Sequence, residues 1–191
     1  MKKHIYDQSQ FGENWFSYPI LYSEMVQKFP SGSKFVEVGC WKGKSAAYMA
    51  VEIANSTKDI EFYCIDTWEG SIEHEGVKEL TKLYDIFLSN MKPVEDYYFP
   101  LKISSLDAVK KFKDESLDFV FIDASHEYED VKKDIEMWLP KVKPGGIFAG
   151  HDYYVGEHDW FPGVKQAVNE TLSGFDCSEI CWIYHKGETN K

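Results

Sequence analysis

The stretch EVGCWKGKS, residues 37–45, lies between an apolar segment and a helical pattern, and it decides which α/β fold the chain can adopt. A nucleotide phosphate loop has four residues between its first glycine and the Gly-Lys-Ser, but only three separate Gly39 from Gly43. The dinucleotide fingerprint GxGxxG would need glycines where Trp41 and Lys44 stand, and a tryptophan there would block the approach of a pyrophosphate. What remains is an acid followed by GxxxG. This pattern requires some other ligand.

Around this stretch, short apolar runs alternate with helical patterns, which is typical of βαβ units and a mainly parallel sheet. Five strands are predicted over residues 34–39, 60–66, 97–103, 116–123 and 145–152. Two further runs, 175–180 and 181–186, have no helix between them and predict an antiparallel hairpin. Helices are predicted over residues 44–54, 76–91, 106–112, 128–139 and 163–172. The expected fold is a three-layer αβα sandwich with a seven-stranded, mostly parallel sheet and one antiparallel edge strand.

The ends of these elements carry their own signals. The run KVKPGG, residues 141–146, predicts a helix stop and a turn before the fifth strand. Residues 13–29 predict an amphipathic helix that is interrupted or begins near Pro19. We therefore expect a single domain over residues 1–191, with a helical extension over 1–30 and the α/β core over 31–191.

The composition indicates a folded domain that does not act on nucleic acid. The 191 residues are 43% apolar and 16% aromatic, which is enough to bury a core. The formal charge of −11 is spread along the chain, so nucleic acid or an anionic membrane is not the expected partner. No apolar run suits a signal peptide or spans a bilayer, so we expect a cytoplasmic protein; a homo-oligomer is left open. The cysteines, expected to be plain thiols, are Cys40, Cys64, Cys177 and Cys181.

Polar side chains follow each of the first five predicted strands. They are Glu37 with Gly39, Asp66, Ser104 with Ser105, Asp123 with His126, and His151 with Asp152. Ligands of open α/β sheets bind outside the carboxyl ends of the strands, so we expect these residues to share one site. Asp66 follows Gly39 by 27 residues, about the distance at which an acid binds the ribose hydroxyls. The acidic Glu37 disfavours phosphate, which indicates a nucleoside with a positive charge.

Three segments together resemble a known family. FVEVGCWKGKSA (35–46), YCIDTWEGS (63–71) and LDFVFIDASHEYEDVKKDIEMWLPKVKPGGIFAGHDYY (117–154) are similar to the class I S-adenosylmethionine-dependent methyltransferases. The resemblance is to the branch that includes small-molecule and sugar O-methyltransferases, and it covers about residues 33–173. It implies a Rossmann-like fold, S-adenosylmethionine as cofactor and a small-molecule acceptor.

The resemblance also implies roles for individual residues. The implied cofactor-binding residues are Glu37, Gly39, Cys40 and Gly43 at the methionine part, Asp66 with Thr67 at the ribose, Trp68 over the adenine and Ser105 at its edge. In metal-dependent members, the positions of Asp123, His151 and Asp152 bind magnesium, and that of His126 serves as the base. Because His151 is a softer ligand than a carboxylate, manganese, iron or no metal also stays open.

The chemistry of methyl transfer agrees with these roles. The methyl carbon is already activated by the sulfonium, so the protein mainly aligns the reactants and removes a proton from the acceptor hydroxyl. A histidine has an unperturbed pKa of about 6.5 and can accept that proton near neutral pH, so His126, beside Asp123, is the expected catalytic base. Asp123 could instead cap the following helix, His126 could bond backbone, and His151 could contact the substrate.

Aromatic side chains flank the predicted acceptor side. They are Trp15, Phe16 and Tyr18 before the sheet, and Tyr153, Tyr154, Trp160 and Phe161 after the fifth strand. Aromatic faces suit sugars or flat, partly apolar acceptors, and they also serve as core packing. Three rival functions stay open: a phosphate-loop hydrolase or kinase, an NAD-dependent oxidoreductase, and a methyltransferase-like binding module without chemistry.

Overall fold

Seven strands form one sheet in the order β3-β2-β1-β4-β5-β7-β6 in the computed structural model, which describes residues 1–12, 14–70, 80–156 and 159–187. Their bounds are β1 Lys34–Val38, β2 Glu61–Asp66, β3 Phe99–Lys102, β4 Leu117–Ile122, β5 Val142–Gly150, β6 Asp176–Ser178 and β7 Cys181–His185. Strands β1 to β5 pair in parallel, whereas β7 pairs antiparallel with both β5 and β6. The predicted seven-stranded, mostly parallel sheet is confirmed, with the reversed strand β7 near one edge and β6 outside it.

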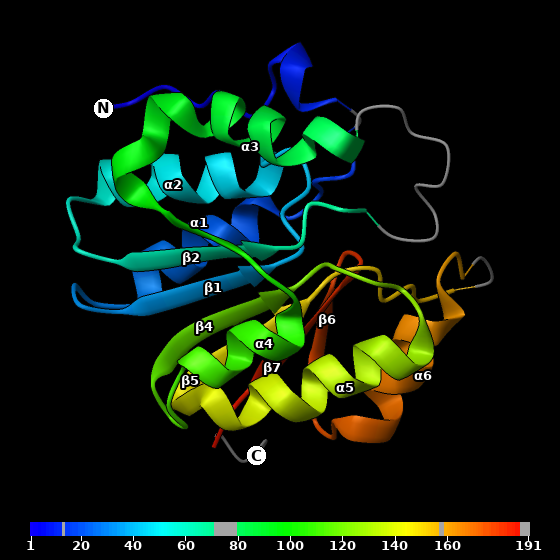
Figure 1. The fold of residues 1–191 in the computed structure, drawn as a ribbon. Helices are drawn as coiled ribbons and strands as arrows, with labels where there is room; N and C mark the ends of the chain where they lie inside the picture. The colour runs from blue at the N-terminus through cyan, green and yellow to red at the C-terminus, as the bar shows by residue number, and fades with distance from the viewer. Residues whose placement is uncertain (13, 71–79, 157–158, 188–191) are drawn as a thin grey trace.

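Helices cover both faces of the sheet and complete three layers (Figure 1). The α-helices are α1 Pro19–Lys28, α2 Lys44–Ser56, α3 Leu83–Met91, α4 Ser105–Ala108, α5 Tyr128–Trp138 and α6 Pro162–Thr171. Short 3₁₀ helices are η1 Ser9–Phe11, η3 Leu80–Lys82, η4 Lys92–Tyr97, η5 Val109–Lys111 and η6 Leu139–Lys141. Helices α1, α2 and α3 lie on one face, and α4, α5 and α6 lie on the other. None of these described helices is long and apolar enough to cross a membrane.

Burial explains why β4 occupies the centre of the sheet. All six residues of its LDFVFI run are buried, because helices pack against both of its faces. The edge strand β3 has no buried residue and is only four residues long. Short, partly exposed strands at the edges reduce pairing with other chains.

One predicted boundary differs from the structure, the predicted helix start near Pro19 is confirmed, and a third boundary is not tested. The N-terminal helix begins at Pro19, where proline's missing N–H costs nothing in the first turn. Residues 76–79 of the predicted 76–91 helix lie outside the described residues. The turn predicted over 141–146 was wrong, because β5 already begins at Val142. The β4 to β5 register shifts between Leu117 and Phe119, and this irregularity accommodates the glycines of the run within the strand.

The backbone hydrogen bonds of the sheet continue one residue beyond the ends of β1, β4 and β5. The Gly39 N–H donates to the Ile65 carbonyl at 2.8 Å, and the Asp123 N–H donates to the Val38 carbonyl at 2.8 Å. The His151 N–H donates in the same way to the Ile122 carbonyl at 3.0 Å. Gly39, Asp123 and His151 therefore lie side by side at the carboxyl edge of the sheet.

Gly39 has to be a glycine at this edge. Its φ is +90°, and a Cβ built on it would lie 1.9 Å from the carbonyl oxygen of Asp123. Both the left-handed backbone and the contact with the end of β4 therefore exclude a side chain. Gly32 has a similar φ of +89°, but nothing lies within 4 Å of a Cβ built there.

The two glycines form a matched test of this contact. Gly39→Ala should lower the free energy of unfolding by about 3 kcal/mol or more, because steric overlap adds to backbone strain. Gly32→Ala should lower it by only about 1 kcal/mol, since strain acts there alone. Urea denaturation of both variants measures the difference. If both variants lost the same unfolding free energy, a side chain at Gly39 would not overlap with Asp123 in the way described.

Candidate active site

A cavity of about 780 Å³ lies at the carboxyl edge of the sheet. Its described lining includes the loops after β1, β2, β4 and β5 and the N-terminal segment 14–18. The predicted site residues that line it are Gly39, Cys40, Asp66, Thr67, Ser105, Asp123, His126, His151 and Asp152. Three predicted cofactor-binding residues, Glu37, Gly43 and Trp68, are not among the lining residues. The parallel strands thus gather most of the predicted site into one cavity.

Asp66 shapes the glycine loop. Its Oδ2 accepts hydrogen bonds from the backbone N–H groups of Cys40 and Trp41, both at 2.9 Å, and its Oδ1 accepts one from the Trp68 N–H at 2.7 Å. Burial raises the pKa of Asp66, and these backbone hydrogen bonds act against that rise. The carboxylate therefore holds the loop after β1 against the end of β2, while it also lines the cavity.

Glu37 lies beneath the cavity wall and is not among its lining residues, so its contact with the cofactor stays a prediction. The side chain is fully buried, its Oε1 accepts a hydrogen bond from Ser45 Oγ at 2.5 Å, and its Oε2 accepts one from Tyr22 Oη at 3.1 Å. Burial raises its pKa to about 8, although the two hydrogen bonds act to lower it. Ser45, which the sequence analysis did not select, lines the cavity in its place.

Trp68 and Gly43 also have packing roles. Trp68 is 2% exposed, its Nε1 donates to the Trp41 carbonyl at 2.9 Å, and its ring packs against Phe87. It therefore belongs to the core, and its place over an adenine stays a prediction. A Cβ on Gly43 would lie 3.0 Å from the Phe87 ring, so this glycine lets α3 approach the loop.

Ser105 belongs to a buried polar network at another wall of the cavity. Its Oγ donates to Asp134 Oδ1 at 2.5 Å and accepts a hydrogen bond from Trp138 Nε1 at 2.8 Å. Burial raises the pKa of Asp134 to about 6, and the Ser105 hydrogen bond acts to lower it. No sequence signal distinguishes Asp134, because its spacing in α5 is that of any polar helix residue.

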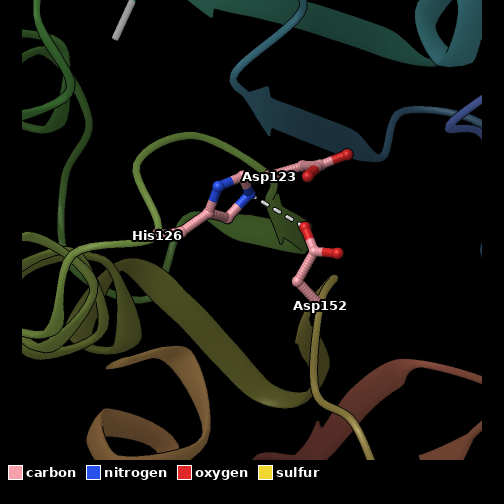
Figure 2. Close-up of side chains that lie close together, drawn as sticks. All are labelled: Asp123, His126 and Asp152. Carbon is pink, nitrogen blue, oxygen red and sulfur yellow. Dashed lines mark ion pairs between the residues drawn. The ribbon is translucent and has the colours of Figure 1, made fainter. Parts of the chain in front are cut away.

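His126 and Asp152 form a close polar pair in the cavity (Figure 2). Nε2 of His126 lies 2.9 Å from Oδ2 of Asp152. The imidazole also stacks on the Phe161 ring, with 3.8 Å between centroids and 25° between planes. Burial acts to raise the pKa of Asp152, but hydrogen bonds from His126 and His151 outweigh it and hold the pKa below its usual range. The loop after β4 and the end of β5 are joined by this pair.

His151 is a buried cation between two carboxylates. Its Nδ1 lies 3.2 Å from Asp152 Oδ2 and 3.6 Å from Asp123 Oδ1, and its Nε2 lies 3.0 Å from Ser17 Oγ. Burial acts to lower its pKa, but the two carboxylates raise it to about 10. An imidazole that keeps both protons has no lone pair for a metal ion.

Three of the predicted site residues lie close enough together to hold a metal ion. Within the part of the chain that the structure describes, ligand atoms of Asp123, His126 and Asp152 lie within 4.8 Å of one another (Figure 2). This group contains His126 and not His151, and the metal set predicted with His151 stays a prediction. One imidazole and two carboxylates are a donor set that suits manganese or iron better than magnesium.

The N-terminal segment supplies two polar contacts to this cluster. Tyr18 Oη donates to Asp123 Oδ2 at 2.8 Å, and Ser17 Oγ contacts His151. These pairs span 105 and 134 positions in the chain. The ring of Tyr18 is predicted from the sequence to flank the acceptor side, but no local signal predicts a hydrogen bond between residues so far apart in the chain.

A family model described as a methyltransferase domain matches residues 36–153, more than half of the chain. The chain belongs to this methyltransferase domain family. The expected resemblance to class I S-adenosylmethionine-dependent methyltransferases is therefore confirmed.

Several solved structures share the fold of this methyltransferase domain. The O-methyltransferase NovP has a TM-score of 0.67 at 15% identity, over 89% of this chain and 79% of that chain. The O-methyltransferase from Bacillus cereus, in complex with SAH, has a TM-score of 0.56 at 18% identity, over 85% and 67%. CalS11, a TDP-rhamnose 3'-O-methyltransferase, has a TM-score of 0.61 at 12% identity, over 89% and 77%.

Two curated relatives match parts of the chain. The uncharacterized protein y4gI of Sinorhizobium fredii is 30% identical over 125 residues, which are 65% of this chain and 14% of that protein. An uncharacterized protein of Acanthamoeba polyphaga mimivirus is 27% identical over 140 residues, which are 73% of this chain and 59% of that protein. The chain therefore spans less than two thirds of the length of either relative.

The raised pKa of Glu37 predicts how stability depends on pH. Between pH 4.5 and about 8, the unfolded chain loses this proton while the folded protein keeps it, so the group destabilises the fold increasingly as pH rises. Glu37→Gln carries no such proton. Its unfolding free energy relative to the wild type should therefore rise by up to about 1.4 kcal/mol per pH unit across this range.

Urea denaturation at several pH values between 4.5 and 8 measures this difference. The control is Glu24→Gln, because Glu24 is exposed on α1. A difference between Glu37→Gln and the wild type that stays constant with pH would contradict the neutral state of Glu37.

Proposed function

We propose that the protein transfers a methyl group from S-adenosylmethionine to a hydroxyl group of a small-molecule or sugar acceptor, with His126 as the general base. The observation that carries the proposal is the shared cavity, which joins the His126–Asp152 pair to the glycine loop and Asp66. Its volume of about 780 Å³ is within the range of small-molecule sites. The fold shared with NovP and CalS11, both named as O-methyltransferases, supports a hydroxyl acceptor.

The cofactor fits the side of the cavity formed by β1 and β2. Helix α2 begins after Gly43 with no side-chain cap, and its first residues, Lys44 and Ser45, line the cavity. The positive end of a helix suits the carboxylate of the methionine part. Asp66 would face the ribose hydroxyls, and Thr67 and Ser105 would border the base. When bound, S-adenosylmethionine supplies a methyl group that its sulfonium already activates.

His126 is placed to take the proton of the acceptor. Because Asp152 pairs with Nε2, it favours the tautomer with hydrogen on that atom and leaves Nδ1 as the basic nitrogen. The carboxylate also stabilises the imidazolium that forms, and stacking on Phe161 holds the ring in place. Asp123, held by Tyr18, would accept a hydrogen bond from the acceptor hydroxyl and direct it toward the base.

A divalent cation would compete with this role. Asp123, His126 and Asp152 would hold it, and it would lower the pKa of the acceptor hydroxyl. One lone pair of His126 cannot both bind a cation and accept a proton. In the described geometry Asp152 already pairs with two imidazoles, so the base route needs no cation to balance this carboxylate.

Ligand binding tests the cofactor. S-adenosylhomocysteine at 100 times its Kd should stabilise the protein by about 2.7 kcal/mol through binding to the native state, and ATP and NAD should not. Asp66→Asn should weaken this ligand about tenfold or more, because an amide cannot accept all three loop N–H groups. Asp114→Asn, at an exposed carboxylate, is the control. Thermal unfolding and calorimetry measure both effects. Stabilisation by ATP without any by S-adenosylhomocysteine would overturn the proposed function.

Kinetics of a His126 variant test the base. His126→Ala should bind S-adenosylhomocysteine normally and slow methyl transfer by about 10²- to 10⁴-fold, with partial rescue by added imidazole. His4→Gln is the control, because His4 lies outside the cavity lining and pairs with Glu52. A radiolabelled methyl group measures transfer to any acceptor found by screening. A His126→Ala rate within about threefold of the wild type would remove the base role.

Chelation separates the base from a metal. Exhaustive treatment with EDTA should leave the wild-type rate unchanged, because the proposed route uses only the His126–Asp152 pair. A rate that falls with EDTA and returns with manganese would instead assign Asp123, His126 and Asp152 to a metal ion. The affinity for S-adenosylhomocysteine, measured in the same samples, controls for loss of folded protein.

A further inference from the structure

We propose that the acceptor is a ring-bearing hydroxyl compound without phosphate or carboxylate groups, and that Trp15 and Trp160 hold its ring at the mouth of the cavity. This inference rests on the proposed function, because it concerns the acceptor side of the same cavity. Two independent features of the described residues support it: the placement of aromatic rings, and the sign of the charges around the reacting hydroxyl.

The aromatic rings extend from the cavity mouth to the base. Trp15 and Trp160 both line the cavity, yet their side chains are 57% and 73% exposed, so they stand at its mouth. Trp15 lies 6.3 Å from the tilted ring of Trp41, which also lines the cavity. Next to Trp160 in the chain, Phe161 stacks on His126. A ring that covered Trp15 and Trp160 would remove their apolar faces from water and leave its hydroxyl near His126.

The charges on the acceptor side disfavour an anion. Asp123 and Asp152 face the cavity there, and the nearby cation His151 is already shared between them at 3.6 and 3.2 Å. Lys44 is the single lysine among the described lining residues, and it begins α2 on the cofactor side. A phosphate or carboxylate near His126 would meet two carboxylates and no unshared cation among these described residues.

The composition of the whole chain points the same way. All 21 of its basic residues are lysines, and it contains no arginine. The planar guanidinium is the side chain that binds phosphate and carboxylate in a bidentate manner, so this form of anion recognition is not available here. A nucleoside diphosphate sugar would bring two phosphates to this negatively charged region. A neutral or cationic ring compound would not meet this repulsion.

Matched probes of different charge test the inference in protein saturated with S-adenosylhomocysteine. The aromatic series is dopamine, 3,4-dihydroxybenzyl alcohol and 3,4-dihydroxyphenylacetate; the sugar series is methyl glucosaminide, methyl glucoside and glucose 1-phosphate. In at least one series, the neutral and cationic members should bind ten times more tightly than the anion by calorimetry. Anions that bind as tightly as their neutral counterparts would overturn the inference. So would the failure of every neutral and cationic probe to bind at millimolar concentration.

Substitutions at the cavity mouth test the residues. Trp15→Ala and Trp160→Ala should each weaken the best neutral probe by about tenfold and change S-adenosylhomocysteine affinity by less than twofold. Trp160→Lys should reverse the preference, because it supplies a cation for the anionic probe. Phe99→Ala is the control, since Phe99 is 50% exposed on β3 and does not line the cavity. Unchanged probe affinity in both alanine variants would overturn the assignment of these residues.

The outcomes separate the inference from the proposed function. Protein that does not bind S-adenosylhomocysteine contradicts the methyltransferase proposal itself. Protein that binds S-adenosylhomocysteine but prefers the anionic probes keeps that proposal and loses only the inference about the acceptor.

Discussion

The approach of the Gly39 backbone to the end of β4 is the constraint on which the site depends. Because no side chain stands at Gly39, the Asp123 carbonyl lies where a Cβ would be, and the ladder between β1 and β4 extends one residue beyond β4. The same ladder carries His151 beside Asp123. Parallel strands in close register thus bring three chain segments to one edge of the sheet. A wider separation would detach the glycine loop from the residues that face the acceptor.

The charge of the acidic groups at this edge differs between the buried layer and the cavity. Glu37, deep beneath the loop, has its pKa raised to about 8 by burial and stays neutral. Asp123 and Asp152, nearer the cavity, share the buried cation His151. His126 completes the group from the loop after β4. The buried cation lets two carboxylates approach each other in a largely desolvated place, because each one has a partner of opposite charge.

The N-terminal segment connects the fold to the site. Residues 14–18 line the cavity, and Tyr18 and Ser17 contact Asp123 and His151. Phe16 and Tyr18 are themselves buried in the same core cluster as α1 and α2. The polar groups of the site are therefore held by hydrophobic packing as well as by the sheet. In the proposed function, this packing fixes the positions of Asp123 and His151 before any ligand binds.

Much of this architecture follows from the sequence. The alternation of strands and helices predicts the sheet, the three-residue spacing between Gly39 and Gly43 excludes a phosphate loop, and the polar residues after each strand predict where the site lies. These signals are local, and the carboxyl ends of parallel strands must meet at one edge.

The orientation of individual side chains depends instead on contacts between distant parts of the chain. Alternation along β1 turns Glu37 toward Tyr22 and away from the cavity, and core packing buries Trp68. Only the tertiary structure decided that Asp123, His126 and Asp152 gather in one group and that Ser17 and Tyr18 reach this edge, because contacts between residues more than 100 positions apart leave no local signal.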